Sequence, residues 1–148
     1  MATAHPVTRP YALKTATALF KLTSVGATVE DFSDHIDEIT LAPSQTTGTP
    51  FVAINGKTIQ ENGSSTWSVT NNLVQDLDDG GFLRWLLDHE GQKCQVLYTF
   101  AAGTDPLPVT VTLASPGLGG KADGSVTVTS VTMPIDGAVN FDADAELE

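Results

Sequence analysis

The 148-residue sequence has little positive charge and a single cysteine. Seven lysines and arginines stand against 18 aspartates and glutamates, which gives a formal net charge of −11. A protein that binds nucleic acid tightly needs a basic surface to neutralise phosphates, so this composition argues against a DNA-binding protein. Cys94 has no partner for an intrachain disulfide, and we expect it to be a small buried hydrophobic residue in a strand.

Long apolar runs are also missing. No stretch approaches the ~20 apolar residues that span a bilayer, and residues 1–14 contain no apolar core of a signal peptide. We therefore expect no membrane partner and synthesis in the cytoplasm. With 41% hydrophobic and 17% charged residues, the chain has the composition of a globular protein. Its length suits one domain with one core.

The acidic residues do not form a recognisable catalytic or metal-binding motif. Along a strand, side chains alternate between two faces, so the carboxylates of the densest cluster do not converge on its histidine. This cluster consists of Glu30, Asp31, Asp34, His35, Asp37 and Glu38. We interpret it as a solvated acidic face, as runs of charge in a sequence usually are. A small hydrolase that uses Asp34, His35 or Glu38 is the enzymatic alternative.

Two other segments resemble ion or phosphate sites but fail on spacing. Asp76, Asp78 and Asp79 match the start of a calcium-binding loop, but Leu87 stands where the bidentate glutamate belongs. The glycine-rich segment 117–121 lacks the Gly-x4-Gly-Lys-Ser/Thr frame of a phosphate-binding loop. We therefore expect no enzymatic activity, no catalytic residues, no metal and no cofactor.

Alternating apolar and polar residues predict at least six strands. Their approximate bounds are 12–23, 29–42, 65–75, 93–101, 107–115 and 124–134. In the second strand, Ile36 is expected to face away from Ile39. In the last strand, the apolar phase changes between Val128 and Val131, which predicts a bulge near residues 129–130.

One helix is expected in the middle of the chain. Asp78 or Asp79 is predicted to cap it, it covers about residues 79–90, and Gly91 ends it. Its apolar stripe at helical spacing is formed by Phe82, Trp85, Leu86 and His89. Strands on both sides of this helix predict a mainly β fold, either a β-sandwich or a partly closed barrel with one flanking α-helix.

Three segments have the composition of irregular structure. Residues 1–11 are predicted to be an N-terminal arm and residues 138–148 a C-terminal tail, while residues 43–65 form a long early loop. Within this loop, apolar residues flank Asn55-Gly56, which predicts a hairpin with a type I′ turn. The glycine, proline and polar content of the arm, the loop and the tail predicts that all three segments are disordered until the protein assembles.

The order of elements resembles the major tail tube proteins of long-tailed, siphovirus-type bacteriophages, which run strand, helix and strand in their middle. The likeness covers most of the chain from about residue 12, as a pattern of elements without an invariant motif. The segments that carry it are Ser65–Val69, the Leu- and Trp-rich helix Phe82–Asp88, Gly91, the strand end Leu97–Phe100 and the closing segment Ser130–Gly137.

This resemblance implies a tail-tube domain over residues 12–137, whose copies form hexameric rings with sheets joined edge to edge. Stacked rings would enclose an acidic channel through which DNA passes without specific binding. The resemblance also implies a virion tail protein assembled in the host cytoplasm, with a tape-measure protein and a tail terminator as further partners.

Site residues follow from the same resemblance. Residues 43–65 would reach the adjacent ring, and the inter-ring contact residues are expected to be Phe51, Val52, Ile54, Asn55, Gly56 and Lys57. The channel wall is assigned to the wet faces of two strands. These channel-lining residues are Glu38, Thr66, Ser68, Thr70 and Asn72. Antiparallel sheets commonly keep one face in water, so the same residues would look identical on an outer surface.

Two non-enzymatic alternatives remain open at this stage. An immunoglobulin-like adhesion or carbohydrate-binding module would share the alternating strands and the lack of paired cysteines. A tube subunit of a contractile tail or a secretion apparatus would share the family fold.

Overall fold

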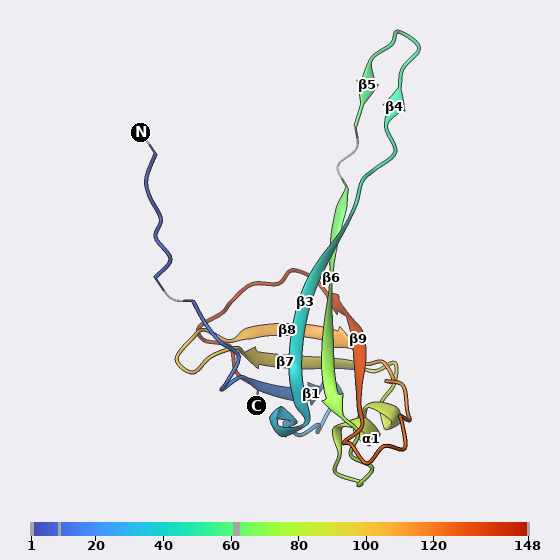
Figure 1. Cartoon of the computed structure of the whole chain (residues 1–148). Coiled ribbons are helices and arrows are strands. Elements are labelled where there is room, and N and C mark those ends of the chain that lie inside the picture. The colour runs from blue at the N-terminus through green and yellow to red at the C-terminus, as the bar shows by residue number, and fades with distance from the viewer. Residues whose placement is uncertain (1, 9, 61–62, 148) are drawn as a thin grey trace.

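The computed structural model describes residues 2–8, 10–60 and 63–147, so five positions of the predicted arm, loop and tail lie outside the described residues (Figure 1). The strands are β1 (Thr17–Leu22), β2 (Glu30–Asp31), β3 (Ile36–Thr46), β4 (Phe51–Val52), β5 (Thr58–Ile59), β6 (Ser64–Val74), β7 (Lys93–Thr99), β8 (Leu107–Thr112) and β9 (Val128–Asp136). The helices are the 3-10 helix η1 (Ser33–His35) and α1 (Phe82–Asp88).

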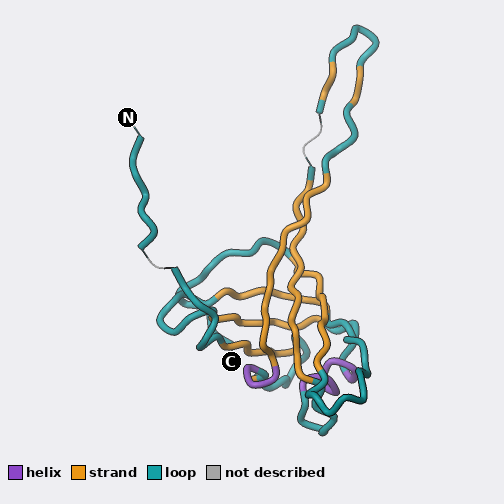
Figure 2. The backbone as a smooth tube through the Cα atoms, viewed as in Figure 1, coloured by secondary structure: helices purple, strands orange, loops and turns teal. Residues whose placement is uncertain are grey.

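Seven strands form one antiparallel sheet in the order β2-β1-β7-β8-β9-β6-β3, and β4 pairs with β5 in a second sheet. The large sheet folds over on itself, because β3, β6 and β9 run across β1, β7 and β8 (Figures 1 and 2). The two groups join where β8 pairs with β9 through Thr110↔Asp136 and Val111↔Ile135. The predicted mainly β fold with one α-helix is confirmed for the described residues, and the sheet is not closed into a barrel.

The core lies between these two groups of strands and follows the predicted alternation. Cys94, Val96 and Tyr98 of β7 alternate into the core, as do Val131 and Met133 of β9, although Leu97 on the other side of β7 is also buried. Helix α1 closes one end of this core with Phe82, Leu83 and Leu86. The helix joins an aromatic cluster with ring centroids 4.7 Å apart for Phe32 and Phe82 and 5.0 Å apart for Phe20 and Phe82.

A buried polar pair connects the two groups of strands across the core. The Tyr98 hydroxyl of β7 donates a hydrogen bond to Oδ1 of Asn71 in β6 at 3.2 Å, and both side chains are fully buried. Burial raises the pKa of Tyr98, so its hydroxyl stays protonated and remains a donor. The strand alternation places residue 71 on the core side, but it does not indicate that an asparagine there finds a partner.

The helix is shorter than predicted and its expected cap is wrong. Helix α1 begins after Gly81, and no side chain caps it by a hydrogen bond. Asp78 instead accepts a backbone hydrogen bond from Gly81 through its carbonyl oxygen at 2.9 Å, and Asp79 forms an ion pair with Arg84. The helix ends at Asp88 with His89 as its C-cap, so the predicted end at Gly91 is wrong by two residues. Gly91 has a φ of 84°, in the left-handed region that favours glycine, and its amide donates to the Leu113 carbonyl oxygen at 2.8 Å.

The bulge lies in a different strand from the one predicted. Strand β9 starts at Val128 and pairs with β6 without a register shift from Val128 to Ile135, so the predicted bulge at residues 129–130 is wrong. The apparent phase change arises because Val126 lies before the strand and Val128, at its start, is on the exposed side, opposite the buried Val131. The register shifts instead in β3 between Ile36 and Glu38, and this bulge turns Ile36 toward the core together with Ile39.

We predict that Phe82→Ala lowers the free energy of unfolding by about 3–5 kcal/mol, because it empties the centre of the aromatic cluster. Leu87→Ala, on the exposed side of the same helix, is the matched control and should change it by about 0.5 kcal/mol or less. Urea denaturation followed by circular dichroism measures both changes. Equal losses for the two variants would contradict the packing described.

A second prediction concerns alkaline pH. Burial raises the pKa of the Cys94 thiol from 9.0 to about 12, so the folded state favours the neutral thiol. The stability that this provides is complete below pH 9 and is lost as the pH rises toward 12. We expect unfolding free energies measured between pH 8 and 11 to fall more steeply for the native chain than for Cys94→Ala. Parallel curves would contradict this.

Candidate assembly surfaces

The most prominent surface feature is a long hairpin that leaves the body of the protein. Strands β3 and β6 remain paired beyond the core as far as Thr46↔Ser64, and β4 and β5 continue the projection (Figures 1 and 2). The predicted early loop carrying a hairpin is therefore confirmed, although residues 43–46 and 64–65 belong to the strands. Gln60 braces the stem by donating from Nε2 to the Gly48 carbonyl oxygen at 2.8 Å.

The turn at the end of the hairpin differs from the predicted type I′ turn. Gly56 has a φ of 85°, but Asn55 has a negative φ, whereas a type I′ turn needs positive values at both. The Gly56 backbone amide donates to the Ala53 carbonyl oxygen at 3.0 Å. The Ala53 backbone amide donates to the Lys57 carbonyl oxygen at 2.8 Å. These two hydrogen bonds are typical of a connection longer than a two-residue turn, in which Gly56 has the left-handed backbone conformation. The Asn55 side chain accepts from the Lys57 amide at 3.1 Å.

The end of this hairpin, residues 51–59, is apolar and exposed, and we call it the hairpin tip. The exposed fraction is 61% for Phe51, 64% for Val52, 109% for Ile54 and 57% for Ile59. Lys57 is the only charged residue between positions 47 and 60. The predicted inter-ring contact residues are therefore brought together at one projecting end. Ile59, which the sequence reasoning missed, joins them because it pairs directly with Phe51.

The predicted channel-lining residues also share one face. In the β3–β6 ladder, Asn72 lies opposite Glu38, Thr70 opposite Thr40, and Thr66 opposite Ser44. The β6 members of these pairs, together with Ser68, form the outer side of β6, and their β3 partners continue the same face. The buried side chains of Val69, Asn71 and Leu73 lie on the other side of β6. We call this surface the polar face; β9 extends it with Ser130 and Thr132.

Short hydroxyl and amide side chains dominate the polar face, and they are hydrogen-bonded to each other. Thr70 and Thr132 share a hydrogen bond of 2.9 Å between their hydroxyls, and Asn72 donates to the Asp37 carboxylate at 2.7 Å. The negative charges near this face are those of Asp37 and Glu38, at the start of β3. A face without basic or large apolar side chains offers few attachment points for a phosphate backbone.

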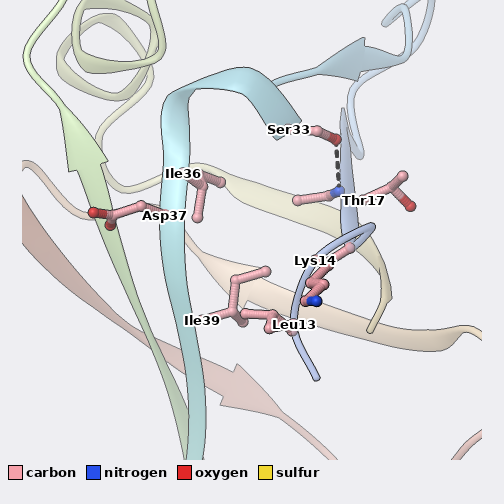
Figure 3. Close-up of a pocket in the computed structure, with 9 residues that line it drawn as sticks. Leu13, Lys14, Thr17, Ser33, Ile36, Asp37 and Ile39 are labelled. Carbon is pink, nitrogen blue, oxygen red and sulfur yellow. Dashed lines mark hydrogen bonds between the residues drawn. The ribbon is translucent and has the colours of Figure 1, made fainter. Parts of the chain in front are cut away.

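The edges of the large sheet are two further candidate surfaces. Strand β3 is terminal over its whole length, and at the other edge β2 covers only Leu19 and Phe20 of β1. A small cavity of about 200 Å³ separates β1 from β3, and Figure 3 shows Leu13 and Lys14 lying in this gap. The hydroxyl of Ser33 holds η1 against β1 by accepting from the Ala18 amide at 3.0 Å. An intervening segment thus keeps the sheet from closing.

The residues of the enzymatic alternative lie on two elements, η1 and β3. Asp34 is exposed and His35 half-buried on η1, while Glu38 follows the bulge in β3. The His35 ring packs edge-on against Phe32 with centroids 6.0 Å apart. Among the described residues, no group of three or more histidine, cysteine, aspartate or glutamate side chains could hold a metal ion. Within the same part of the chain, no helix has the length and apolar character needed to span a membrane.

No protein-family model matches the chain, and no curated protein matches it. Chains in several solved structures are similar in fold, among them the following three. The first is the virion of a native gene transfer agent particle, with a TM-score of 0.52 and 18% identity over 85% of this chain and 95% of that one. The second is the tail of an empty gene transfer agent particle with C6 symmetry, with a TM-score of 0.50 and 20% identity over 84% and 95%.

The third is the sixfold-symmetrised baseplate of the anti-feeding prophage, with a TM-score of 0.51 and 10% identity over 94% of this chain and 100% of that one. In all three, nearly the whole of the other chain is covered, so the likeness concerns a complete fold rather than a shared fragment. At these identities the likeness shows that the chain has the same fold as proteins of tail and baseplate particles.

Proposed function

We propose that this protein is a structural subunit of a phage-like tail, and that it has no catalytic role. The observation that carries the proposal is the projecting hairpin with its exposed apolar tip. Such a protrusion exposes several large apolar side chains to water, which a stable isolated module avoids. The fold likeness to chains in virion, tail and baseplate particles supports the same assignment.

The finer proposal is a tail tube made of stacked hexameric rings. Closure of a ring gives the terminal strand β3 and the short edge at β1 and β2 a partner in the next subunit, which removes the unpaired sheet edges. Two of the similar structures have sixfold symmetry, which supports six copies to a ring. The hairpin tip then contacts the adjacent ring.

The polar face lines the channel in this arrangement. Six copies of a chain with net charge −11 carry −66 to a ring, which opposes lasting contact with DNA. Counterions screen this field beyond a Debye length of ~8–10 Å, so the short neutral side chains at the wall matter as much as the total charge. DNA passes such a wall without being bound.

A tube or baseplate subunit of a contractile apparatus is the second candidate, and the likeness to the anti-feeding prophage baseplate favours it over an adhesion module. Tape-measure and terminator proteins are partners in either system. The tube assignment is preferred because the hairpin, the open edges and the polar face each find a role in it.

Assembly of the purified chain tests the proposal. Electron microscopy at high protein concentration should show rings or tubes. A variant in which residues 48–60 are replaced by a short Asn-Gly turn should form rings without long tubes, because it keeps both sheet edges and lacks the tip. Persistent monomers of the native chain, or tubes of normal length from the shortened variant, would contradict the proposal.

The channel assignment gives a separate prediction. Thr70→Lys places a positive charge on the polar face, and assembled tubes of this variant should retain short duplex DNA that native tubes exclude. Leu87→Lys, on the exposed side of α1, is the control and should retain no DNA inside tubes. Sedimentation of tubes with labelled DNA at two salt concentrations measures the difference. Equal retention of DNA by both variants would contradict the assignment of the polar face to the channel wall.

A further inference from the structure

The end of the protein opposite the hairpin carries a second exposed apolar surface. Strand β6 runs from the hairpin to this end, and β9 begins there (Figure 1). The connection of residues 116–127, the orange-red loop beside α1, folds against the residues that follow β6. Together they form a shallow, open hollow of about 510 Å³, lined among others by Gln75, Leu77, Leu118 and Thr127. We call it the basal hollow.

Hydrogen bonds hold the basal hollow in shape. The Gln75 side chain donates from Nε2 to the Gly119 carbonyl oxygen at 2.9 Å and accepts from the Gly119 amide at 3.1 Å. The backbone amide of Gln75 donates to the Thr127 carbonyl oxygen at 2.9 Å. A Cβ on Gly120 would lie 2.6 Å from the Thr127 side chain, so the loop packs closely against itself here. The hollow therefore exists before any partner binds.

The rim of the basal hollow leaves apolar side chains in water. Two large apolar side chains line it: Leu77 is 70% exposed and Leu118 is 61% exposed. Exposed leucines that share one hollow make it a candidate contact surface.

The charges at this end are predominantly negative. The segments that form and flank the hollow contribute the carboxylates of Asp76, Asp78, Asp79 and Asp123. Arg84, paired with Asp79, and Lys121, which lines the hollow, are the basic groups of these segments, so their four carboxylates and two basic groups sum to a net charge of −2. The hairpin tip has the opposite character, with one lysine and no acidic residue between positions 47 and 60.

We propose that the basal hollow receives the hairpin tip of a second copy of this chain. This inference rests on the proposed function, because it names the surface against which the tip stacks. The two surfaces are apolar, opposite in charge and located at opposite ends of the same long strands. A contact between different surfaces of identical subunits is heterologous, and it propagates along one direction instead of closing. The subunits therefore stack head to tail, each tip in the next hollow.

Disulfide trapping tests this contact in the full-length chain. The parent is Cys94→Ala, which removes the only native thiol. One variant adds Ile54→Cys at the tip, and a second, carrying a mass tag, adds Leu118→Cys at the hollow. The matched control replaces the second by Phe141→Cys, because Phe141 is 64% exposed on the C-terminal tail against 61% for Leu118. Equimolar mixtures are assembled, oxidised and analysed on non-reducing gels.

We expect the mixed disulfide of positions 54 and 118 to exceed that of positions 54 and 141 about tenfold, the ratio that a preference of 1.4 kcal/mol produces. Leu118→Asp in the native chain should also raise the concentration needed for tubes, whereas Phe141→Asp should not. Circular dichroism verifies the fold of each variant.

The outcomes separate this inference from the proposed function. Tubes that form without enrichment of the 54–118 disulfide would overturn the proposal that the basal hollow receives the tip. The proposal that the protein is a tube subunit would still hold. Enrichment of the 54–141 disulfide would have the same two consequences and place the tip on the C-terminal tail. Absence of rings and tubes in the Cys94→Ala parent and the native chain would overturn both.

Discussion

The antiparallel ladder between β3 and β6 is the interaction on which the rest of the structure depends. It begins beside the core at Ile36↔Leu73 and continues without interruption from Glu38↔Asn72 to Thr46↔Ser64, beyond the body of the protein. Near the core, every second side chain is buried in β6 and half-buried in β3, while the other side of the ladder forms the polar face. Farther out no core remains, and backbone hydrogen bonds maintain the pairing together with a few side-chain hydrogen bonds, such as that between the hydroxyls of Thr46 and Ser64. One ladder therefore supports the core, the polar face and the hairpin tip.

The fold around this ladder leaves its sheet open. Two crossing groups of strands bury a shared apolar core, which the Tyr98–Asn71 hydrogen bond spans. A closed barrel would need β1 to pair with β3, but residues 13–14 and η1 occupy the gap between them. Open edges and exposed apolar ends are unfavourable for a solitary protein. They become useful when identical copies cover them, and this is the physical link between the fold and the proposed role in a tail.

The candidate surfaces were predictable to different extents. The residues of the hairpin tip follow from an Asn-Gly pair between the segments 51–54 and 57–60, and the polar face follows from period-two alternation in β6. Ile59 and the basal hollow were not predictable in this way. Ile59 joins the tip through pairing with Phe51, and the hollow forms because Gln75 fixes a glycine-rich loop more than 40 residues distant in sequence.

The sequence by itself determined the mainly β fold, the core residues of most strands, the single α-helix and the acidic character, because these depend on local periodicity and composition. The tertiary structure decided the position of the bulge in β3, the start of α1 without a side-chain cap, the turn geometry at Gly56 and the open sheet. Each of these depends on contacts between distant segments. Ile36 faces the core because its register with Leu73 shifts at the bulge, and alternation along the sequence contains no information about that shift.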